Sequence, residues 1–535
     1  MSYVLQVSID LSHNNISVIE SQSFQELSNI TVLDLSYNQI ERIRKNAFDS
    51  SDVTIFLLNN NLISNLSKVD IFANMTGLRF LNLSHNVINE LTRKDFTPKR
   101  LYEMQSIDLS HNHIQDISGN VFEKFGSLRF IDLSYNRLRK IGFSSFGTLS
   151  TLLDLDISHN NITEITNGGV SSLVSVKTIY ANDNRIEKMF PISVALNVLH
   201  LERNNISTIR SNIFPMINAL LAIYLDDNRL TALEEYSFAN CLTLQTLSLS
   251  NNQLTEVPIY SLKSLTSLQY LNLNGNRISE LKSRAFGKMG ILFDLRLDQN
   301  QIKNVSELAF DGLLQLLKLN MSSNLIESLT PEVFFGLVSL RTLDLSHNQL
   351  NHLENRTNGV FEPLLSMEYL NLSHNSISLI KEKTFPSSPW IPYKLKHLDL
   401  SHNSMPVLTQ QFDSGLTKVE WLSLKNNMIN EIQTNVFSNL TYLRYLDISG
   451  NQLRKVLKGM FGPKMDNLTD LSLNNNKLST IYPQELSQLK NLKELDLSGN
   501  RLVEINEEFL TKLKSGLVIH FNGKTKTHSN GLKFF

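Results

Sequence analysis

Cysteine is almost absent from this 535-residue chain, which contains only Cys241. The sequence therefore excludes an intrachain disulfide and a zinc site built from several cysteines. A low cysteine content fits a cytosolic protein, and it fits equally well a part of a secreted protein whose cysteines lie elsewhere. The cysteine count thus leaves the cellular compartment open.

An excess of charge of one sign is also absent, because 50 Lys and Arg residues stand against 51 Asp and Glu residues. We expect no nucleic-acid partner, since such proteins carry clustered basic surfaces. No run of about 18 apolar residues occurs, so we expect no direct membrane insertion of this chain. Its first residues, MSYVLQVSIDLSHNNI, lack the basic and apolar regions of a signal peptide. We therefore expect this chain to carry neither an export signal nor an anchor.

Motifs of catalysis are missing as well, because the sequence contains no Gly-rich phosphate loop, HExxH or GxSxG. The tripeptide Ser-His-Asn occurs seven times and resembles a catalytic group. On an extended segment, however, neighbouring side chains diverge, so Ser346 and His347 do not form a nucleophile–base pair. The histidines of the triplets lie along a line, one repeat apart, and do not converge on one metal ion. We expect no enzymatic activity, no metal site and no cofactor.

The sequence does contain a regular repeat. The pattern LxLxxNxLxxL occurs 21 times, and thirteen of the twenty intervals between its asparagines are 24 residues long. This period predicts a leucine-rich repeat horseshoe, an α/β-type solenoid with a concave parallel sheet and few regular helices on its convex side. Because side chains alternate along a strand, Leu343 and Leu345 are expected to point into the core. Thr342, Asp344 and Ser346 are expected to point outward.

The repeated asparagine has a physical reason to recur at one place. A turn that buries backbone groups must satisfy their hydrogen bonds, and a carboxamide offers an acceptor oxygen and two N–H donors. One such side chain per coil predicts a hydrogen-bonded ladder between neighbouring coils. Its members include Asn38, Asn136, Asn252, Asn348, Asn427 and Asn500.

A phenylalanine follows ten residues after the asparagine in thirteen repeats. These rings predict a spine that fills the space between the sheet and the outer wall. The spine consists of Phe24, Phe48, Phe96, Phe122, Phe146, Phe214, Phe238, Phe286, Phe310, Phe334, Phe385, Phe437 and Phe461, while Phe72, Phe412 and Phe509 miss the position by one residue. The repeat between Asn184 and Asn204 is only 20 residues long and lacks this phenylalanine.

No Pro-, Gly- or Ser-rich linker interrupts the repeats. We predict one solenoid of about 21 repeats over residues 1–523, followed by a non-repeat tail over residues 524–535. Solenoids need polar caps at both ends, and neither end of this sequence shows one. The open ends lead us to expect a truncated or alternatively spliced chain.

The unit LDLSHNQLNHLEN…VFEPLLSMEYL, with its phenylalanine spine, resembles the typical leucine-rich repeat of animal extracellular proteins. The long, cysteine-poor run of units is most similar to chaoptin-type arthropod cell-adhesion proteins, with Toll-like receptor ectodomains and Slit-like proteins as neighbours. The resemblance implies a glycosylated, protein-binding scaffold, extracellular or at the cell surface in the parent protein. A fragment of a Toll-like or other ligand-sensing receptor is the alternative, and an intracellular scaffold is less favoured. The implied partner is a protein ligand or a second copy of the chain, as in a homophilic contact or a dimer.

Two groups of outward residues are candidate partner contacts. Four consecutive repeats carry an aromatic residue six positions before the asparagine, and aromatic residues are enriched at binding hot spots. Cross-strand pairing on an exposed sheet is the alternative explanation of this row. The row consists of Tyr369, His397, Trp421 and Tyr445. The second group flanks the shortened repeat, where a local change of curvature is the alternative, and consists of Tyr180, His200, Glu202, Arg203, Tyr224 and Asp226.

Two further features have open alternatives. The interval from Asn375 to Asn403 is enlarged to 28 residues, and its prolines predict an outer loop that carries Trp390 as a partner contact or as a tolerated insertion. The histidine before the asparagine gives way to Tyr, Gly or Asn in other repeats, which predicts an exposed and permissive position. Repulsion between protonated histidines of consecutive repeats, at about pH 6, is the alternative role of this position. These consecutive histidines are His347, His374 and His402.

Asparagine-linked glycosylation motifs occur thirteen times, whereas composition alone predicts about ten. Three of them, at Asn82, Asn320 and Asn371, fall on the expected sheet face, where a glycan would obstruct binding. The other candidate sites are Asn15, Asn29, Asn65, Asn74, Asn161, Asn205, Asn304, Asn355, Asn439 and Asn467.

Overall fold

The chain forms stacked coils that divide into two compact units. Unit 1 comprises Met1–Gln253 and Tyr260–Leu268, and unit 2 comprises Leu254–Ile259 and Gln269–Phe535. The computed structural model describes residues 7–24, 30–48, 53–66, 75, 77–96, 103–143, 145–147, 149–353, 359–388, 390–391, 393–462, 465–481, 483–502, 504–505, 516–522, 524–525 and 533–534.

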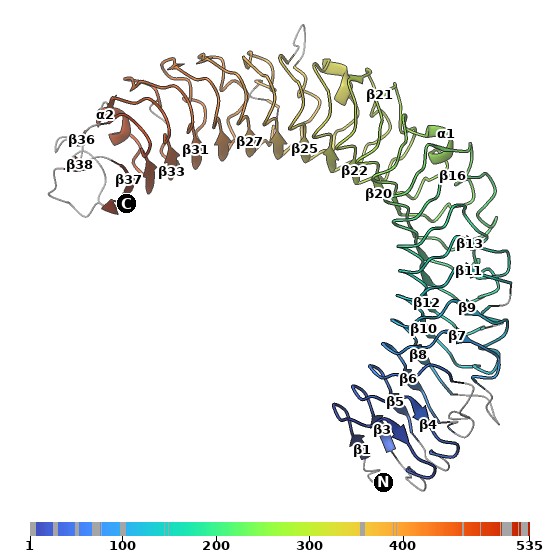
Figure 1. Cartoon of the computed structure of the whole chain (residues 1–535). Coiled ribbons are helices and arrows are strands. Elements are labelled where there is room, and N and C mark those ends of the chain that lie inside the picture. Colours follow the sequence, from blue (N-terminus) through green and yellow to red (C-terminus); the bar gives the residue numbers. More distant parts are fainter. Residues whose placement is uncertain are drawn as a thin grey trace, which may run out of the picture. The chain divides into compact units, whose positions relative to one another are not determined.

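In each unit, one strand per coil joins a parallel sheet that lines the inner side of the coils (Figure 1). The sheet strands of unit 1 are β1 (Val7–Asp10), β3 (Ile30–Asp34), β5 (Ile55–Leu57), β6 (Phe80–Asn82), β8 (Ser106–Asp108), β10 (Phe130–Asp132), β12 (Asp154–Asp156), β14 (Thr178–Tyr180), β15 (Val198–His200), β17 (Ala222–Tyr224) and β19 (Thr246–Ser248). Those of unit 2 are β20 (Tyr270–Asn272), β22 (Asp294–Arg296), β24 (Lys318–Asn320), β25 (Thr342–Asp344), β26 (Tyr369–Asn371), β27 (His397–Asp399), β29 (Trp421–Ser423), β31 (Tyr445–Asp447), β33 (Asp470–Ser472), β35 (Glu494–Asp496), β37 (Val518–His520) and β39 (Lys533–Phe534).

A second set of two-residue strands lies after the asparagine turn and pairs in twos. In unit 1 these are β2 (Val18–Ile19), β4 (Arg42–Ile43), β7 (Glu90–Leu91), β9 (Asp116–Ile117), β11 (Lys140–Ile141), β13 (Glu164–Ile165), β16 (Thr208–Ile209) and β18 (Ala232–Leu233). In unit 2 they are β21 (Glu280–Leu281), β23 (Asn304–Val305), β28 (Val407–Leu408), β30 (Glu431–Ile432), β32 (Lys455–Val456), β34 (Thr480–Ile481), β36 (Glu504–Ile505) and β38 (Lys524–Thr525). The helices of the described residues are single turns, namely α1 (Ile259–Leu262), α2 (Pro483–Ser487) and the 3-10 helix Pro331–Phe334.

The sheet register places equivalent residues of successive coils side by side. Thr342 of β25 pairs with Tyr369 of β26, and Leu343 pairs with Leu370. The middle residue of each three-residue sheet strand is buried, whereas its two neighbours face the inner surface and most of them are partly exposed. Each position of the repeat therefore becomes a column that runs across the sheet.

Asn348 shows how the asparagine ladder joins neighbouring coils. Its Nδ2 donates to the carbonyl of Met321 in the preceding coil at 3.0 Å. The same nitrogen donates within its own coil to the carbonyl of Leu345 at 3.1 Å. Its Oδ1 accepts the N–H of Ile326 of the preceding coil at 3.0 Å. Equivalent bonds to the preceding coil are made by Asn38, Asn136, Asn252, Asn427 and Asn500.

The phenylalanine spine stacks along the core with centroid distances of 5.2 Å for Phe24–Phe48, 5.9 Å for Phe286–Phe310 and 6.3 Å for Phe437–Phe461. Phe361 continues the row between Phe334 and Phe385, at 6.2 Å and 5.5 Å, and was missed because its coil is 27 residues long. The shortened coil also contributes an aromatic ring to the core, because its Phe190 is buried. Phe412 is buried in an edge-on contact with Phe437, while Phe72 and Phe509 lie outside the described residues. The predicted fold class, a parallel-sheet solenoid with almost no helix, is confirmed.

The expectation that Ser346 points outward is wrong, since only 5% of this residue is exposed. Oδ1 of Asp344 accepts the N–H of Ser346 at 2.9 Å, and this bond turns the chain out of the strand. The alternation of side chains ends at that turn, so the serine lies inside it. Ser134, Ser158 and Ser401 are buried in the same way beside an aspartate two residues earlier.

Replacement of Asn348 by alanine is expected to destabilise the chain by about 2–4 kcal/mol, because it leaves buried backbone groups of two coils without partners. The control is Gln349→Ala, which removes an exposed side chain beside the ladder. The measurement is urea unfolding followed by circular dichroism. Equal midpoints for the two variants would show that the ladder does not hold the coils together.

Candidate functional site

The aromatic row predicted on the sheet face of unit 2 is a continuous stack. Tyr369, His397, Trp421 and Tyr445 are the first residues of β26, β27, β29 and β31, which pair in register. The ring centroids are 4.5 Å apart for Tyr369–His397, 3.8 Å for His397–Trp421 and 5.3 Å for Trp421–Tyr445. The planes differ by 18°, 6° and 3°, so the four rings stand parallel on successive strands.

This stacking determines which part of each ring a partner can reach. Both faces of His397 and of Trp421 are covered by neighbouring rings, so these residues present their edges to solvent. Burial raises the pKa of Tyr369, and burial with the nearby Asp447 raises the pKa of Tyr445 to about 12. Burial also lowers the pKa of His397. The row is therefore an uncharged, partly buried ridge at neutral pH.

Charged residues border this ridge on both sides. Before the strands, Lys396 pairs with Glu368 at 3.8 Å, and Arg444 pairs with Glu420 at 3.6 Å. At the other ends of the strands, the column formed by Asp344, Asn371, Asp399, Ser423 and Asp447 gives polar side chains. An apolar centre with a polar rim is the usual anatomy of a protein interface.

The second predicted group lies in unit 1 and is also brought together by the fold. Tyr180, His200 and Tyr224 are the last residues of β14, β15 and β17, and their rings stack at 4.8 Å and 4.7 Å. Nδ1 of His200 lies 2.9 Å from Oε1 of Glu202. Burial raises the pKa of Tyr224, and the nearby carboxylates of Glu202 and Asp226 add to this shift.

The charged members of this group are engaged by their neighbours. Arg203 donates from Nη2 to Oδ2 of Asp183 at 2.6 Å, and this bond lowers the pKa of Asp183. Nε2 of His159 lies 3.3 Å from the same carboxylate. Asp226 accepts hydrogen bonds from the hydroxyl groups of Ser248 and Ser250. The patch is therefore a hydrogen-bonded surface whose charged side chains are held by their neighbours.

The residue before the ladder asparagine is more constrained than the permissive position that we expected. It adopts left-handed backbone, with φ of 53° at His347 and 54° at His374. Asparagine and glycine tolerate this conformation best, which explains Asn426, Gly275 and Gly450 in other coils. The recurrence of Asn, Asp and Gly at one place was the signal for this constraint.

The side chains at the left-handed position form rows, as the sequence predicts for the triplet histidines, and their rings stack, which the sequence did not indicate. His347–His374 and His374–His402 stack at 4.1 Å and 4.0 Å in unit 2. In unit 1 the centroid distances are 4.1 Å, 4.3 Å and 4.0 Å along the row His85, His111, Tyr135 and His159. Burial and the neighbouring histidines lower the pKa of His374, and burial together with His85 lowers that of His111.

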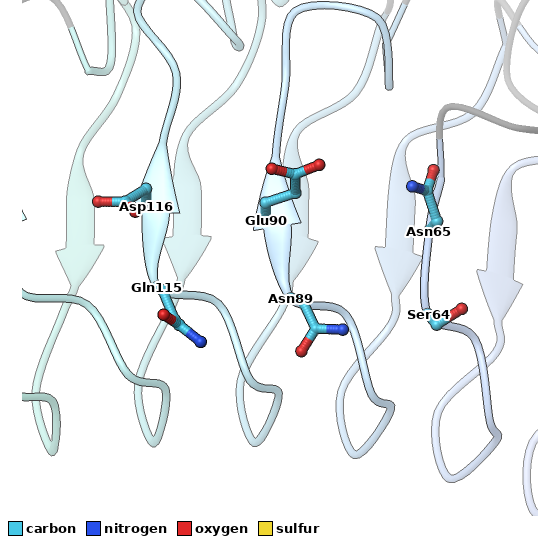
Figure 2. A pocket seen from close by; sticks show the side chains of 6 residues that line it. All are labelled: Ser64, Asn65, Asn89, Glu90, Gln115 and Asp116. Atoms are coloured by element: carbon cyan, nitrogen blue, oxygen red, sulfur yellow. The ribbon is translucent and has the colours of Figure 1, made fainter.

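The predicted glycosylation sites differ in their surroundings. Asn15, Asn304, Asn439 and Asn467 are exposed, Asn65, Asn161 and Asn205 are partly exposed, and Asn29, Asn74 and Asn355 lie outside the described residues. Asn65 borders a shallow polar hollow of about 380 Å³ beside β7 and β9, whose other lining residues Ser64, Asn89, Glu90, Gln115 and Asp116 are shown in Figure 2. The side-chain nitrogens of Asn439 and Asn467 donate to Asp413 and to the carbonyl of Thr441, so a glycan at either nitrogen would leave only one N–H for this bond.

The enlarged coil of unit 2 exposes one tryptophan and buries one tyrosine. Trp390 is 92% exposed, as expected for the predicted outer loop. Tyr393 is buried near Phe385, at a centroid distance of 6.3 Å, and anchors the loop to the core.

Over the described ranges, no group of three or more His, Cys, Asp or Glu side chains could hold a metal ion. None of the helices described is long and apolar enough to span a membrane.

Comparison with known proteins places this architecture among repeat proteins. The family model described as leucine rich repeat matches residues 7–63, 94–138, 132–186, 194–254, 242–302, 292–350, 393–453 and 454–502, which is more than half of the chain. Tsukushi of Gallus gallus is 34% identical over 117 residues, 22% of this chain and 31% of Tsukushi. Toll-like receptor 4 of Boselaphus tragocamelus is 44% identical over 68 residues, 12% of this chain and 8% of the receptor. The chain thus aligns with less than a third of each of these relatives.

A solved structure extends the likeness of fold over most of the chain. The complex of Toll and Spatzle from Drosophila, in its glycosylated form, is similar with a TM-score of 0.65. The alignment covers 89% of this chain and 81% of that chain, at 18% sequence identity. At this level of identity the likeness shows the fold alone.

Stability is expected to fall as the pH drops from about 7.5 to about 5.5, because the folded chain resists protonation of His374 and His111. A histidine whose folded pKa is lowered contributes stability above its ordinary pKa of about 6.5, and this contribution is lost as the pH falls below that value. The measurement is the thermal midpoint against pH for the wild type and for His374→Asn, which keeps a residue suited to the left-handed position. The variant should show a shallower decline than the wild type. The control His113→Asn lies outside the rows, and an equally shallow decline in this control would contradict the prediction.

Proposed function

Because the chain belongs to the leucine-rich repeat family, we propose that it is a protein-binding scaffold from the ectodomain of a cell-surface adhesion protein of the chaoptin type. The aromatic row Tyr369, His397, Trp421 and Tyr445 contacts the partner. The partner is a protein, and a second copy of the chain is the first one to test. Homophilic contact of this kind would join two molecules without any other component.

The stacked row carries this proposal. Its four rings are held parallel on paired strands, so they lose little freedom when a partner packs against their edges. Each aromatic pair also stabilises the fold by about 0.5–1.5 kcal/mol, which is the alternative reason for the row. A tryptophan and two tyrosines at the centre of a polar rim have the composition of a binding hot spot.

An extracellular or cell-surface location of the parent protein is part of the proposal. It is supported by the relative that is named a receptor and by the exposed glycosylation motifs at Asn15, Asn304, Asn439 and Asn467. We further propose that the unobstructed motifs at Asn15 and Asn304 carry glycans. An intracellular scaffold remains the less favoured alternative.

A ligand-sensing receptor is the second candidate function. The patch of Tyr180, His200 and Tyr224 favours it, because this patch combines stacked rings with the Asp183–Arg203 pair and so offers polar specificity. A Toll/interleukin-receptor domain in the parent transcript would support the receptor. A hydrophobic anchor signal at the C-terminus of the parent protein would support adhesion.

The double substitution Trp421→Ser and Tyr445→Ser is expected to slow the aggregation of beads coated with the chain by roughly tenfold, because it removes two of the four rings of the row. Bead aggregation is followed by light scattering, and thermal unfolding of the variant separates lost binding from lost folding. Tyr442→Ser is the control, since Tyr442 is 48% exposed in a turn outside the sheet strands. Unchanged aggregation of the double variant would refute the role of the row, and no aggregation of the wild type would refute homophilic contact.

A further inference from the structure

The sheet face of unit 1 contains a shallow hollow of about 300 Å³ that lies next to the Tyr180 patch. It extends over β8, β10, β12 and β14, which pair in register. Its lining residues come from the first, middle and last positions of these strands. The lining residues are Ser106, Ile107, Asp108, Phe130, Ile131, Asp132, Asp154, Asp156 and Tyr180.

Four carboxylates meet at this hollow. Asp108, Asp132 and Asp156 occupy the last position of three neighbouring strands, and Asp154 stands at the first position of β12. One oxygen of each of the first three accepts the N–H of a serine in its own turn, at 2.8–2.9 Å. Burial raises the pKa of Asp132, and the adjacent Asp156 and Asp108 raise it further.

Among the described residues, no ion pair joins one of these carboxylates to a basic side chain, and the charges of Asp132 and Asp108 act on the pKa of His111. On the described sheet face of unit 1, the nearby ion pairs join Asp183 to Arg203 and to His159 instead. Arg129 and Lys177 lie at the margin, one residue before β10 and β14, and Lys177 donates from Nζ to the carbonyl of Ala195. The hollow therefore keeps a local excess of negative charge in a chain whose formal net charge is only −1.

Two aromatic rings beside the carboxylates have faces that no other ring covers among the residues that the structure describes. Tyr180 stacks on His200 of β15, so its other face turns toward Asp156 of β12, with which it pairs in register. Phe130 stands between Ser106 of β8 and Asp154 of β12. Phe130 is 44% exposed and Tyr180 is 37% exposed. This arrangement differs from the row in unit 2, where the inner ring faces are covered.

We propose that this hollow, lined by Asp108, Asp132, Asp154 and Asp156 with the faces of Phe130 and Tyr180, docks a lysine- or arginine-bearing segment of a protein partner. An open aromatic face next to a carboxylate is the arrangement that attracts an ammonium or guanidinium group. The proposal rests on the proposed protein-binding function, and it specifies in addition that the partner segment is positively charged. The hollow shares no residue with the aromatic row of unit 2.

The test uses the whole chain and a short fluorescent lysine–glycine peptide as the probe, with binding measured by fluorescence anisotropy. The wild type should bind this peptide and not its glutamate–glycine counterpart. Binding should weaken as salt is raised to about 0.15 M, because screening reduces charge attraction. Binding of both peptides with equal affinity would overturn the proposal.

The double variant Asp132→Asn and Asp156→Asn should bind the lysine peptide roughly threefold to tenfold more weakly, as expected for two lost charge contacts. Asparagine preserves the turn, because Asn82, Asn320 and Asn371 occupy the same position of the repeat and accept the same serine N–H. The matched control is Asp344→Asn with Asp399→Asn in unit 2, which changes net charge equally outside the hollow. Unchanged binding by the first variant, or an equal loss in both, would overturn the proposal.

Phe130→Ser tests the aromatic wall, and serine is suitable because Ser106 fills the same position in the preceding coil. This variant should weaken peptide binding and leave its salt dependence nearly unchanged, whereas the aspartate variant should reduce that dependence. Unaltered affinity of Phe130→Ser would contradict a role of the ring. The double variant Trp421→Ser and Tyr445→Ser should bind the peptide as the wild type does. Peptide binding therefore tests the hollow and bead aggregation tests the row, so failure of one proposal is distinguishable from failure of the other.

Discussion

The bond between a buried carboxamide and the backbone of two coils is the constraint on which the structure depends. A ladder asparagine donates to a carbonyl of the preceding coil and accepts an N–H from that coil, as Asn348 does with Met321 and Ile326. Backbone groups that would otherwise be buried without partners are thereby satisfied. Aspartate would introduce a buried charge, and an apolar side chain would leave the bonds unmade. The spacing and register of successive coils follow from this one contact.

A fixed register converts each position of the repeat into a column of neighbours. Rings in one column then stack at about the strand spacing, as in the rows of Trp421 and of His374. The same geometry brings together Asp108, Asp132 and Asp156, whose like charges oppose one another. The chemistry of the sheet surface is therefore determined separately for each column. It depends on whether adjacent coils carry the same residue or different residues at that position of the repeat.

The irregular coils show how the core tolerates changes of length. The 27-residue coil places Phe361 in the ring row although it stands at a different distance from the asparagine. The shortened coil buries Phe190, and the enlarged coil buries Tyr393 beneath its outer loop. Added or removed residues change the outer side, because the sheet strands of these coils still pair without a shift in register.

The sequence by itself determined the solenoid and the ladder, since their pattern recurs in every repeat. It also determined most of the spine, since a phenylalanine stands at one position in thirteen repeats. It also placed Tyr369, His397, Trp421 and Tyr445 in one row, because equivalent positions of a repeat must become neighbours. Tertiary structure alone decided that Ser346 is buried and which ring faces stay open, and it revealed that His347 is left-handed. These properties depend on the turn after the strand and on the residue in the next coil. The periodic pattern specifies where each coil lies. The contacts between its outward side chains depend on how the coils pack in the folded molecule.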